Sequence, residues 1–251
     1  MRALRVSIIF SCALHTFAQS VPMQTQARVG DILATHNQWG SLMNTEGATL
    51  TVKEVSRKGN SLTAQFYGKG LPRKWVYSLM SLPLGSPNAS ILLTGVTLDA
   101  DGRAVCSGRP GECGKPGHPN APVTLRLAPG NGEPLRFGLV AKTDQSIRAM
   151  VNYVPFPIAG TDKSCRIEAV ILEPAAGTVH LEAKGLPPGS PVTLNTEMNG
   201  KTAQKQLRTD AKGQATSTLV PNRGTDKKGS IRAQVTASSC SPAITIPWTL
   251  P

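Results

Sequence analysis

Alternating apolar and polar positions dominate the chain and predict short β-strands. In residues 146–153, SIRAMVNY, the apolar side chains Ile147, Ala149 and Val151 occupy every second position. Because successive side chains of a strand point to opposite faces, this period of two predicts a strand with one buried and one solvated face. The same alternation recurs in residues 61–67 (SLTAQFY), 178–183 (TVHLEA) and 230–237 (SIRAQVTA).

Turn-forming residues separate these runs. The Asn-Gly pairs at 131–132 and 199–200 are hairpin signals, because both residue types tolerate a positive φ. Residues 99–102 (DADG) and 210–213 (DAKG) carry Asp first and Gly fourth, as type I turns prefer. The 20 prolines and 24 glycines leave little room for long helices, and residues 31–43 are the one helical candidate. The chain is therefore predicted to be all-β.

Three short patterns occur twice in the same order, which predicts an internal duplication. Gly-Leu-Pro fits a corner where the chain leaves one strand for the next, because Gly bends freely and Pro cannot donate to a central ladder. The first copy is longer, and its extra segment at about 106–135 holds two cysteines and a hairpin signal. The patterns are Gly-Leu-Pro at 70–72 and 185–187, Asp-Ala-x-Gly at 99–102 and 210–213, and Ser-Ile-Arg-Ala at 146–149 and 230–233.

Many short strands with turns between them favour antiparallel β-sandwiches. The duplication places one sandwich domain at residues 47–160, including the extra segment, and a second at residues 165–251. Residues 160–165, GTDKSC, are expected to be a short hinge between them. The predicted architecture is two tandem antiparallel β-sandwich domains.

The turn motifs resemble those of a known class of domains. Gly-Leu-Pro-Pro-Gly at 185–189, followed by Thr-Asp-Ala-x-Gly at 209–213 and a polar strand near the end, resembles the immunoglobulin-like repeats of secreted bacterial proteins. Residues 136–158, RFGLVAKTDQSIRAMVNYVPFPI, followed by a second domain that starts at a cysteine, are similar to uncharacterised envelope proteins of soil bacteria. The resemblance covers most of the mature chain. It implies Ig-like sandwiches and export, and no catalytic residue carries over.

The N-terminus has the features of a secretory signal peptide. A basic head and a short apolar run precede small residues in 1–20, which predicts cleavage after Ala18 or Ser20 and a secreted or periplasmic protein. A lipoprotein attached through Cys12 is disfavoured, because the apolar run before it is very short. Residues 21–46 would then form a linker. No later segment is apolar for 18 residues, so no transmembrane span is expected in the mature chain.

Removal of the signal leaves an even number of cysteines, which suits disulfides in an exported protein. Four cysteines allow three pairings. We favour Cys106–Cys113 and Cys165–Cys240, because each pair then stays inside one predicted domain. A zinc site built from Cys106, Cys113 and His118 is the alternative, but the spacing fits no standard zinc pattern and a fourth ligand is missing.

The chain is strongly basic, with a formal net charge of +12, and its cations concentrate near the C-terminus. Residues 199–232 hold eight lysines and arginines against only Asp210 and Asp226. This stretch is either a solvated basic surface or a face that attracts anionic envelope polymers or lipid headgroups. Nucleic acid is disfavoured by the predicted export and by the few aromatic side chains. The candidate anion-binding residues are Lys201, Lys205, Arg208, Arg223, Lys227, Lys228 and Arg232.

Catalytic and metal-binding motifs are missing from the sequence. It contains no G-x-S-x-G nucleophile elbow and no H-E-x-x-H zinc motif. The histidines of the mature chain, His36, His118 and His180, are expected on loops or solvated faces. A calcium site at Asp99 and Asp101 is disfavoured because the second copy of the turn has Lys at the position of Asp101. We assign no metal and no cofactor.

These patterns predict an exported, non-catalytic protein with a binding or structural role in the cell envelope. Another envelope protein, an anionic polymer or lipid headgroups are the partners considered. Trp75, beside Arg73 and Lys74, is the candidate aromatic contact. A basic module that docks on anionic surfaces is the first alternative, and a hydrolase with an interdomain site is the second.

Overall fold

The computed structural model describes residues 43–84, 86, 88–114, 118–173, 177–220 and 228–249. Several predictions lie outside these residues. They concern the signal peptide 1–20 with Cys12, most of the linker 21–46 with its helical candidate, His36, Arg223 and Lys227.

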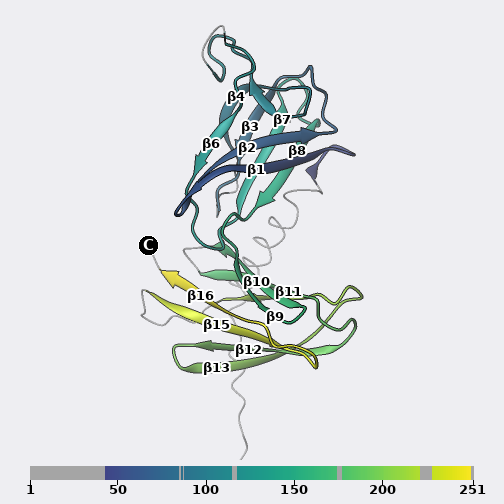
Figure 1. The fold of residues 1–251 in the computed structure, drawn as a ribbon, viewed down its shortest axis with the longest axis vertical. Coiled ribbons are helices and arrows are strands. Elements are labelled where there is room, and N and C mark those ends of the chain that lie inside the picture. Colours follow the sequence, from purple (N-terminus) through teal and green to yellow (C-terminus); the bar gives the residue numbers. More distant parts are fainter. Residues whose placement is uncertain are drawn as a thin grey trace, which may run out of the picture.

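Sixteen strands make up the described chain, and all paired strands run antiparallel (Figure 1). The fold class is therefore all-β, as the alternation predicts. The strands are β1 (Thr49–Lys58), β2 (Ser61–Lys69), β3 (Tyr77–Ser81), β4 (Ser90–Leu98), β5 (Ala104–Cys106), β6 (Thr124–Leu127), β7 (Leu135–Ala141), β8 (Arg148–Tyr153), β9 (Ile158–Asp162), β10 (Cys165–Glu173), β11 (Thr178–Lys184), β12 (Pro191–Met198), β13 (Lys201–Arg208), β14 (Ala215–Leu219), β15 (Lys228–Thr236) and β16 (Ala243–Thr249).

The first sandwich packs a three-stranded sheet, β1-β2-β6, on a five-stranded sheet, β5-β4-β3-β7-β8 (Figure 1). Its core is built from the inward positions of both sheets. Phe66 and Phe137 meet edge to face with ring centroids 5.0 Å apart, and Tyr77 and Leu139 are fully buried beside them. An edge-to-face pair adds about 0.5–1.5 kcal/mol to the burial of its rings.

The second sandwich packs the sheet β14-β11-β10-β9 on the sheet β13-β12-β15-β16. Ile167, Leu181 and Leu194 are fully buried in its core. A disulfide between Cys165 and Cys240 joins the start of β10 to the segment before β16. The alternation predicted for 178–183 is confirmed, because Val179, Leu181 and Ala183 are all buried.

The expected hinge at 160–165 is part of a hairpin. Strand β9 pairs with β10, with Asp162 opposite Cys165, and Lys163 takes a positive φ of 54° in the turn between them. Residues 158–162 therefore lie in a sheet of the second sandwich, where the sequence prediction gave 158–160 to the first.

The two sandwiches meet through two loops of the first one. The backbone N–H of Gly132, in the loop before β7, donates to the carbonyl of Phe156 at 2.7 Å, and its carbonyl accepts from the N–H of Ile171 at 2.8 Å. At the tip of the β1–β2 hairpin, Arg57 donates to the carbonyl of Pro155 at 3.2 Å and lies 4.5 Å from the ring centroid of Phe156. Hydrogen bonds and a cation–π contact thus fix the connecting segment.

Two of the three recurring patterns occupy matching places. Gly-Leu-Pro follows β2 and β11, and the Asp-Ala-x-Gly turn lies between β4 and β5 and between β13 and β14. Ser-Ile-Arg-Ala does not match: it leads into the edge strand β8 in one sandwich and lies on β15, between β12 and β16, in the other. The duplication stays a prediction that rests on the first two patterns.

Candidate anion-binding cleft

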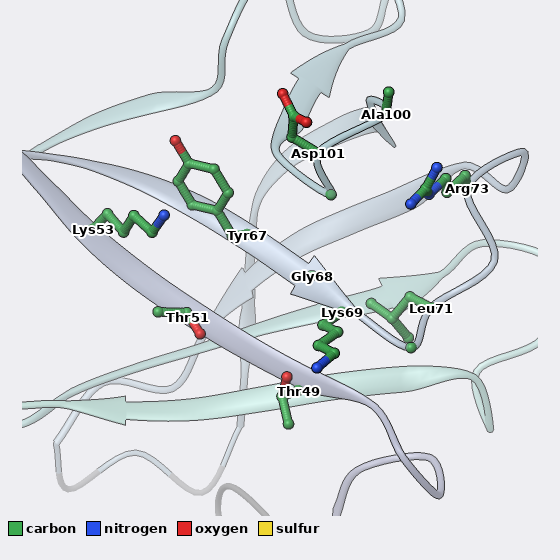
Figure 2. Close-up of a pocket in the computed structure, with 12 residues that line it drawn as sticks. Thr49, Thr51, Lys53, Tyr67, Gly68, Lys69, Leu71, Arg73, Ala100 and Asp101 are labelled. Atoms are coloured by element: carbon green, nitrogen blue, oxygen red, sulfur yellow. The ribbon is translucent and has the colours of Figure 1, made fainter.

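A shallow cleft of about 340 Å³ lies on the outer face of the sheet β1-β2-β6 (Figure 2). Strands β1 and β2 form its floor, and the Gly-Leu-Pro corner and the 99–102 turn form its rim. It is lined by Thr49, Thr51, Lys53, Tyr67, Gly68, Lys69, Gly70, Leu71, Arg73, Ala100, Asp101 and Gly102.

Strand pairing brings the polar side chains of the floor together. On β1 the odd-numbered positions from 49 to 53 are exposed, while Leu50 is buried in the core. The register places Thr49 opposite Lys69 and Thr51 opposite Tyr67, so both strands present polar side chains to the same face. The sequence periodicity thus predicts which side chains leave the core, and the register decides which of them meet.

The cleft carries an excess of positive charge. Figure 2 shows Lys53 reaching from β1 toward the ring of Tyr67, and its Nζ lies 4.1 Å from the ring centroid. Lys69 and Arg73 are exposed, and within the described residues no carboxylate lies at ion-pair distance from any of the three cations. Asp101 is the one carboxylate among the described residues of the lining. The surplus attracts anions, and the cation–π contact favours a position of the Lys53 ammonium over the ring of Tyr67.

In the turn at the rim, the side chain of the first aspartate accepts hydrogen bonds from backbone N–H groups of the same turn. The carboxylate of Asp99 accepts hydrogen bonds from the N–H groups of Asp101 at 3.0 Å and Arg103 at 2.9 Å, and from Arg103 Nε at 3.0 Å. Burial raises the pKa of Asp99, but these hydrogen bonds outweigh burial and leave the pKa below its usual value. The carboxylate therefore serves the turn that the sequence predicts, and a calcium ion would have to compete with it.

The corner that carries Arg73 is held by a buried tyrosine. Tyr77 donates from its hydroxyl to the carbonyl of Pro72 at 2.7 Å, and burial raises the pKa of Tyr77 to about 12. A phenol that stays protonated remains a donor throughout the physiological pH range. Trp75, the candidate aromatic contact, is partly buried against the first core next to this corner.

The matching face of the second sandwich is neutralised. Its register, Arg166 opposite Lys184 and Glu168 opposite Glu182, reproduces the register of the cleft. Arg166 pairs with Glu168 at 2.6 Å, and Lys184 pairs with Glu182 at 2.8 Å. The two glutamates occupy the positions of Thr51 and Tyr67 in the first sandwich.

The predicted basic stretch does not form one face. Lys201 and Lys205 lie opposite Met198 and Leu194 on β12, so they share the side of the sheet that faces the core, and Lys205 Nζ donates to Ser217 Oγ at 3.3 Å. Inward-pointing lysines on an edge strand are a known guard against pairing with another sheet.

Three further cations of that stretch lie on the opposite side of the sheet, while Lys212 lies in the turn between β13 and β14. Arg208 is opposite Pro191, Arg232 is opposite Glu197, and Lys228 shares the parity of Arg232 on β15. Strand alternation therefore divides a run of cations that looks continuous in the sequence.

The cysteines and histidines lie away from the cleft. Cys106 is joined to Cys113, with Cα atoms 5.1 Å apart, and Cys165 to Cys240, with Cα atoms 6.2 Å apart, which is the pairing favoured from the sequence. Among the described residues, no group of three or more His, Cys, Asp or Glu side chains is arranged to hold a metal.

His180 is half-buried rather than fully solvated. It lies on β11, opposite Val170 and Thr218, and burial lowers its pKa, although Glu182 acts in the opposite direction. His118 is exposed.

Sequence reasoning missed the two lysines of the cleft and noted Arg73 only as a neighbour of Trp75. Lys53 and Lys69 are isolated lysines in the sequence, whereas the C-terminal stretch attracts notice through the density of its charges. The available signal was the pair of alternating runs TLTVK (49–53) and QFYGK (65–69), whose polar positions share one face once the strands pair.

The described part of the structure has no helix with the length and apolarity that a membrane crossing requires. Comparison with known proteins adds no relative: no protein-family profile matches the chain, and no curated protein is significantly similar to it.

Proposed function

We propose that the chain is a non-catalytic binding protein whose cleft on the first sandwich holds a linear polyanion. Export to the cell envelope belongs to this proposal and is supported by the signal-like N-terminus and by two disulfides. An Ig-like identity of the sandwiches is supported by the Gly-Leu-Pro corners and by the antiparallel sheets.

One observation carries the proposal. Lys53, Lys69 and Arg73 line a cleft without an ion-pair partner among the described residues, while the matching face of the other sandwich neutralises its cations with Glu168 and Glu182. Uncompensated cations repel one another, so a fold gains nothing from gathering them. A ligand that supplies the missing negative charge accounts for the arrangement.

The spacing of the cations favours an extended ligand. Lys53 lies four residues from Thr49 on β1, and Thr49 is opposite Lys69. At about 3.3 Å per residue, the two lysines attach about 13 Å apart along the strands. A single phosphate or carboxylate could contact both only if the two side chains extended toward each other, whereas neighbouring charges of a linear polymer can contact each lysine separately.

A polymer fits the cleft better than a membrane surface. Membrane-docking faces combine cations with apolar side chains that enter the lipid. The one large aliphatic side chain in the lining, Leu71, is only 7% exposed, and the rest of the floor is Thr, Lys, Tyr and Gly. Thr49 and Thr51 offer hydroxyls for hydrogen bonds to a polar chain.

The test is a titration of the full chain with long polygalacturonate, a linear polymer of carboxylate-bearing sugars, at low and at physiological salt. The wild type is expected to bind at low salt and to weaken steeply as salt rises. Lys53→Glu with Lys69→Glu is expected to weaken binding by about tenfold or more, which corresponds to about 1.4 kcal/mol.

The matched control is Lys58→Glu with Lys212→Glu, which changes the net charge equally at exposed positions outside the cleft. If both double variants lose the same affinity, net charge rather than the cleft causes binding. Binding of acidic vesicles without binding of the polymer would also overturn the proposal.

A further inference from the structure

A second open hollow, of about 850 Å³, lies on the second sandwich, on the face of its sheet β13-β12-β15-β16 that points away from the core. It is formed by the ends of β12, β15 and β16 and by the turn between β12 and β13. Its lining is Glu197, Asn199, Gly200, Lys228, Gly229, Ser230, Arg232, Thr245, Pro247 and Trp248.

Strand pairing again gathers polar side chains from separate strands. Arg232 lies opposite Glu197 on one side and Thr245 on the other, and Ser230 lies opposite Pro247. All five face away from the core, because Ile231 of β15 is buried on the other side of the sheet. Trp248 belongs to the core and closes one wall of the hollow.

The charges of this hollow resemble those of the first cleft. Lys228 and Arg232 are exposed, and neither forms an ion pair within the described residues, although Glu197 is the register partner of Arg232. Among the described lining residues, two cations face one carboxylate here, and three face one in the first cleft. Ser230 and Thr245 supply further hydrogen-bonding groups.

The two hollows are too far apart for one short ligand. The β1–β2 hairpin tip at Arg57 contacts the connecting segment, and the first cleft occupies the other end of the hairpin, from Thr49 to Lys53. The strand between Lys53 and Arg57 alone covers about 13 Å. The second hollow lies beyond the joint, on the other sandwich.

We propose that this hollow is a second polyanion site and that one chain therefore bridges two stretches of an acidic linear polymer. The inference rests on the proposed function, because it assigns the same class of ligand to both sites. Two weak sites on one chain raise the effective concentration of a long polymer at each of them, which gives avidity and cross-linking without new contacts.

The experiment compares short and long forms of one polymer with the full chain. A galacturonate tetramer is titrated calorimetrically at low salt, and the turbidity of long polygalacturonate is followed as protein is added. The wild type is expected to bind two tetramers per chain and to cross-link the long polymer, with turbidity passing through a maximum at an intermediate protein ratio.

Two double variants assign the sites. Lys53→Glu with Lys69→Glu and Lys228→Glu with Arg232→Glu are each expected to bind one tetramer and to abolish the turbidity maximum. The control Lys58→Glu with Lys212→Glu should keep both sites.

The outcomes separate the two proposals. One tetramer per wild-type chain, lost only in the Lys53/Lys69 variant, would overturn bridging and leave the first cleft in place. If the wild type binds one tetramer and only the Lys228/Arg232 variant loses it, the proposal that the first cleft binds a polyanion would be overturned. Absence of binding at low salt would overturn both.

Discussion

The two sandwiches share turn hydrogen bonds and strand register, and they differ in the side chains that they expose to solvent. In both, the carboxylate that opens the Asp-Ala-x-Gly turn accepts from the N–H groups two and four residues later. The distances are 3.0 and 2.9 Å at Asp99, and both are 2.8 Å at Asp210. The register of the strands before the corner also agrees, residue for residue.

Two of the differences between the outer faces place glutamates on the second face. Thr51 and Tyr67 in the first sandwich correspond to Glu168 and Glu182 in the second. The glutamates form ion pairs with Arg166 and Lys184 and neutralise that face, whereas the cations of the first cleft form no ion pair within the described residues. The turn residues and the strand register are thus shared by both sandwiches, whereas side chains on the outer face can change charge without changing the strands.

Even the shared corner is held in two ways. The carbonyl of Pro72 accepts from the hydroxyl of Tyr77, and the carbonyl of Pro187 accepts from the hydroxyl of Thr209, each at 2.7 Å. One acceptor at matching positions is thus served by different donors. Both corners thus carry a side-chain hydroxyl on the proline carbonyl, and at the first corner the Trp75 N–H donates to the same carbonyl at 3.3 Å.

The largest expected difference between the sandwiches is the unfolding free energy lost when each disulfide is removed. Cys165–Cys240 closes a loop with a sequence separation of 75, and Cys106–Cys113 one of 7. The loop-entropy relation gives about 4.5 kcal/mol for the long loop and about 2.5 kcal/mol for the short one. Replacing each pair by serine and measuring urea unfolding should reproduce this order, and a larger loss from the short loop would contradict it.

The corner glycines should be equally intolerant in both sandwiches. Gly70 and Gly185 share a φ of 73°, and a Cβ at either would lie 2.3 Å from a backbone carbonyl oxygen, of Gly47 or of Ser164. Gly70→Ala and Gly185→Ala are each expected to cost about 2 kcal/mol of unfolding free energy through backbone strain. Gly59→Ala has the positive φ but open space, so it should cost less.

The two hydroxyl donors of the corners should have similar effects. Tyr77→Phe removes the hydrogen bond to the Pro72 carbonyl. Thr209→Val removes the one to the Pro187 carbonyl and also the acceptor of the Ser190 N–H, 2.8 Å away, and both variants keep most of the side-chain volume. Each is expected to lower the unfolding free energy by about 1–2 kcal/mol. If Tyr77→Phe lowers the unfolding free energy and Thr209→Val does not, the two hydroxyl hydrogen bonds do not stabilise the corners equally.

The smallest expected difference is a pH effect. His180 of the second sandwich corresponds to Gln65 of the first, and burial lowers the pKa of His180 below its ordinary value of 6.5. The folded state then binds its proton less readily than the unfolded chain. This contribution to stability is therefore complete above pH 6.5 and is lost as pH falls through the folded-state pKa.

His180→Gln should make the stability of the second sandwich less dependent on pH between about 5 and 7, a window set by the ordinary histidine pKa. Thermal unfolding at several pH values measures this. An unchanged pH profile in the variant would assign the dependence to other groups.

The sequence allowed the strands to be predicted but not the cleft. Alternation depends on one strand at a time, which is why the buried faces of 61–67 and 178–183 agree with the structure. The cleft depends on the register between β1 and β2, which the alternation within a single strand does not show. The same limit explains the basic stretch, where the side chains of Lys205 and Arg208 are close in sequence but lie on opposite sides of a sheet.

An exchange of the two glutamate positions between the faces tests the comparison most directly. Polygalacturonate affinity is measured for Thr51→Glu with Tyr67→Glu, which gives the first face the glutamates of the second, and for Glu168→Thr with Glu182→Tyr, which removes them from the second. We expect the first exchange to weaken binding by about tenfold or more and the second to strengthen it, since electrostatic attraction follows the local charge. Unchanged affinity in the first exchange would contradict the assignment of the cleft as the polyanion site.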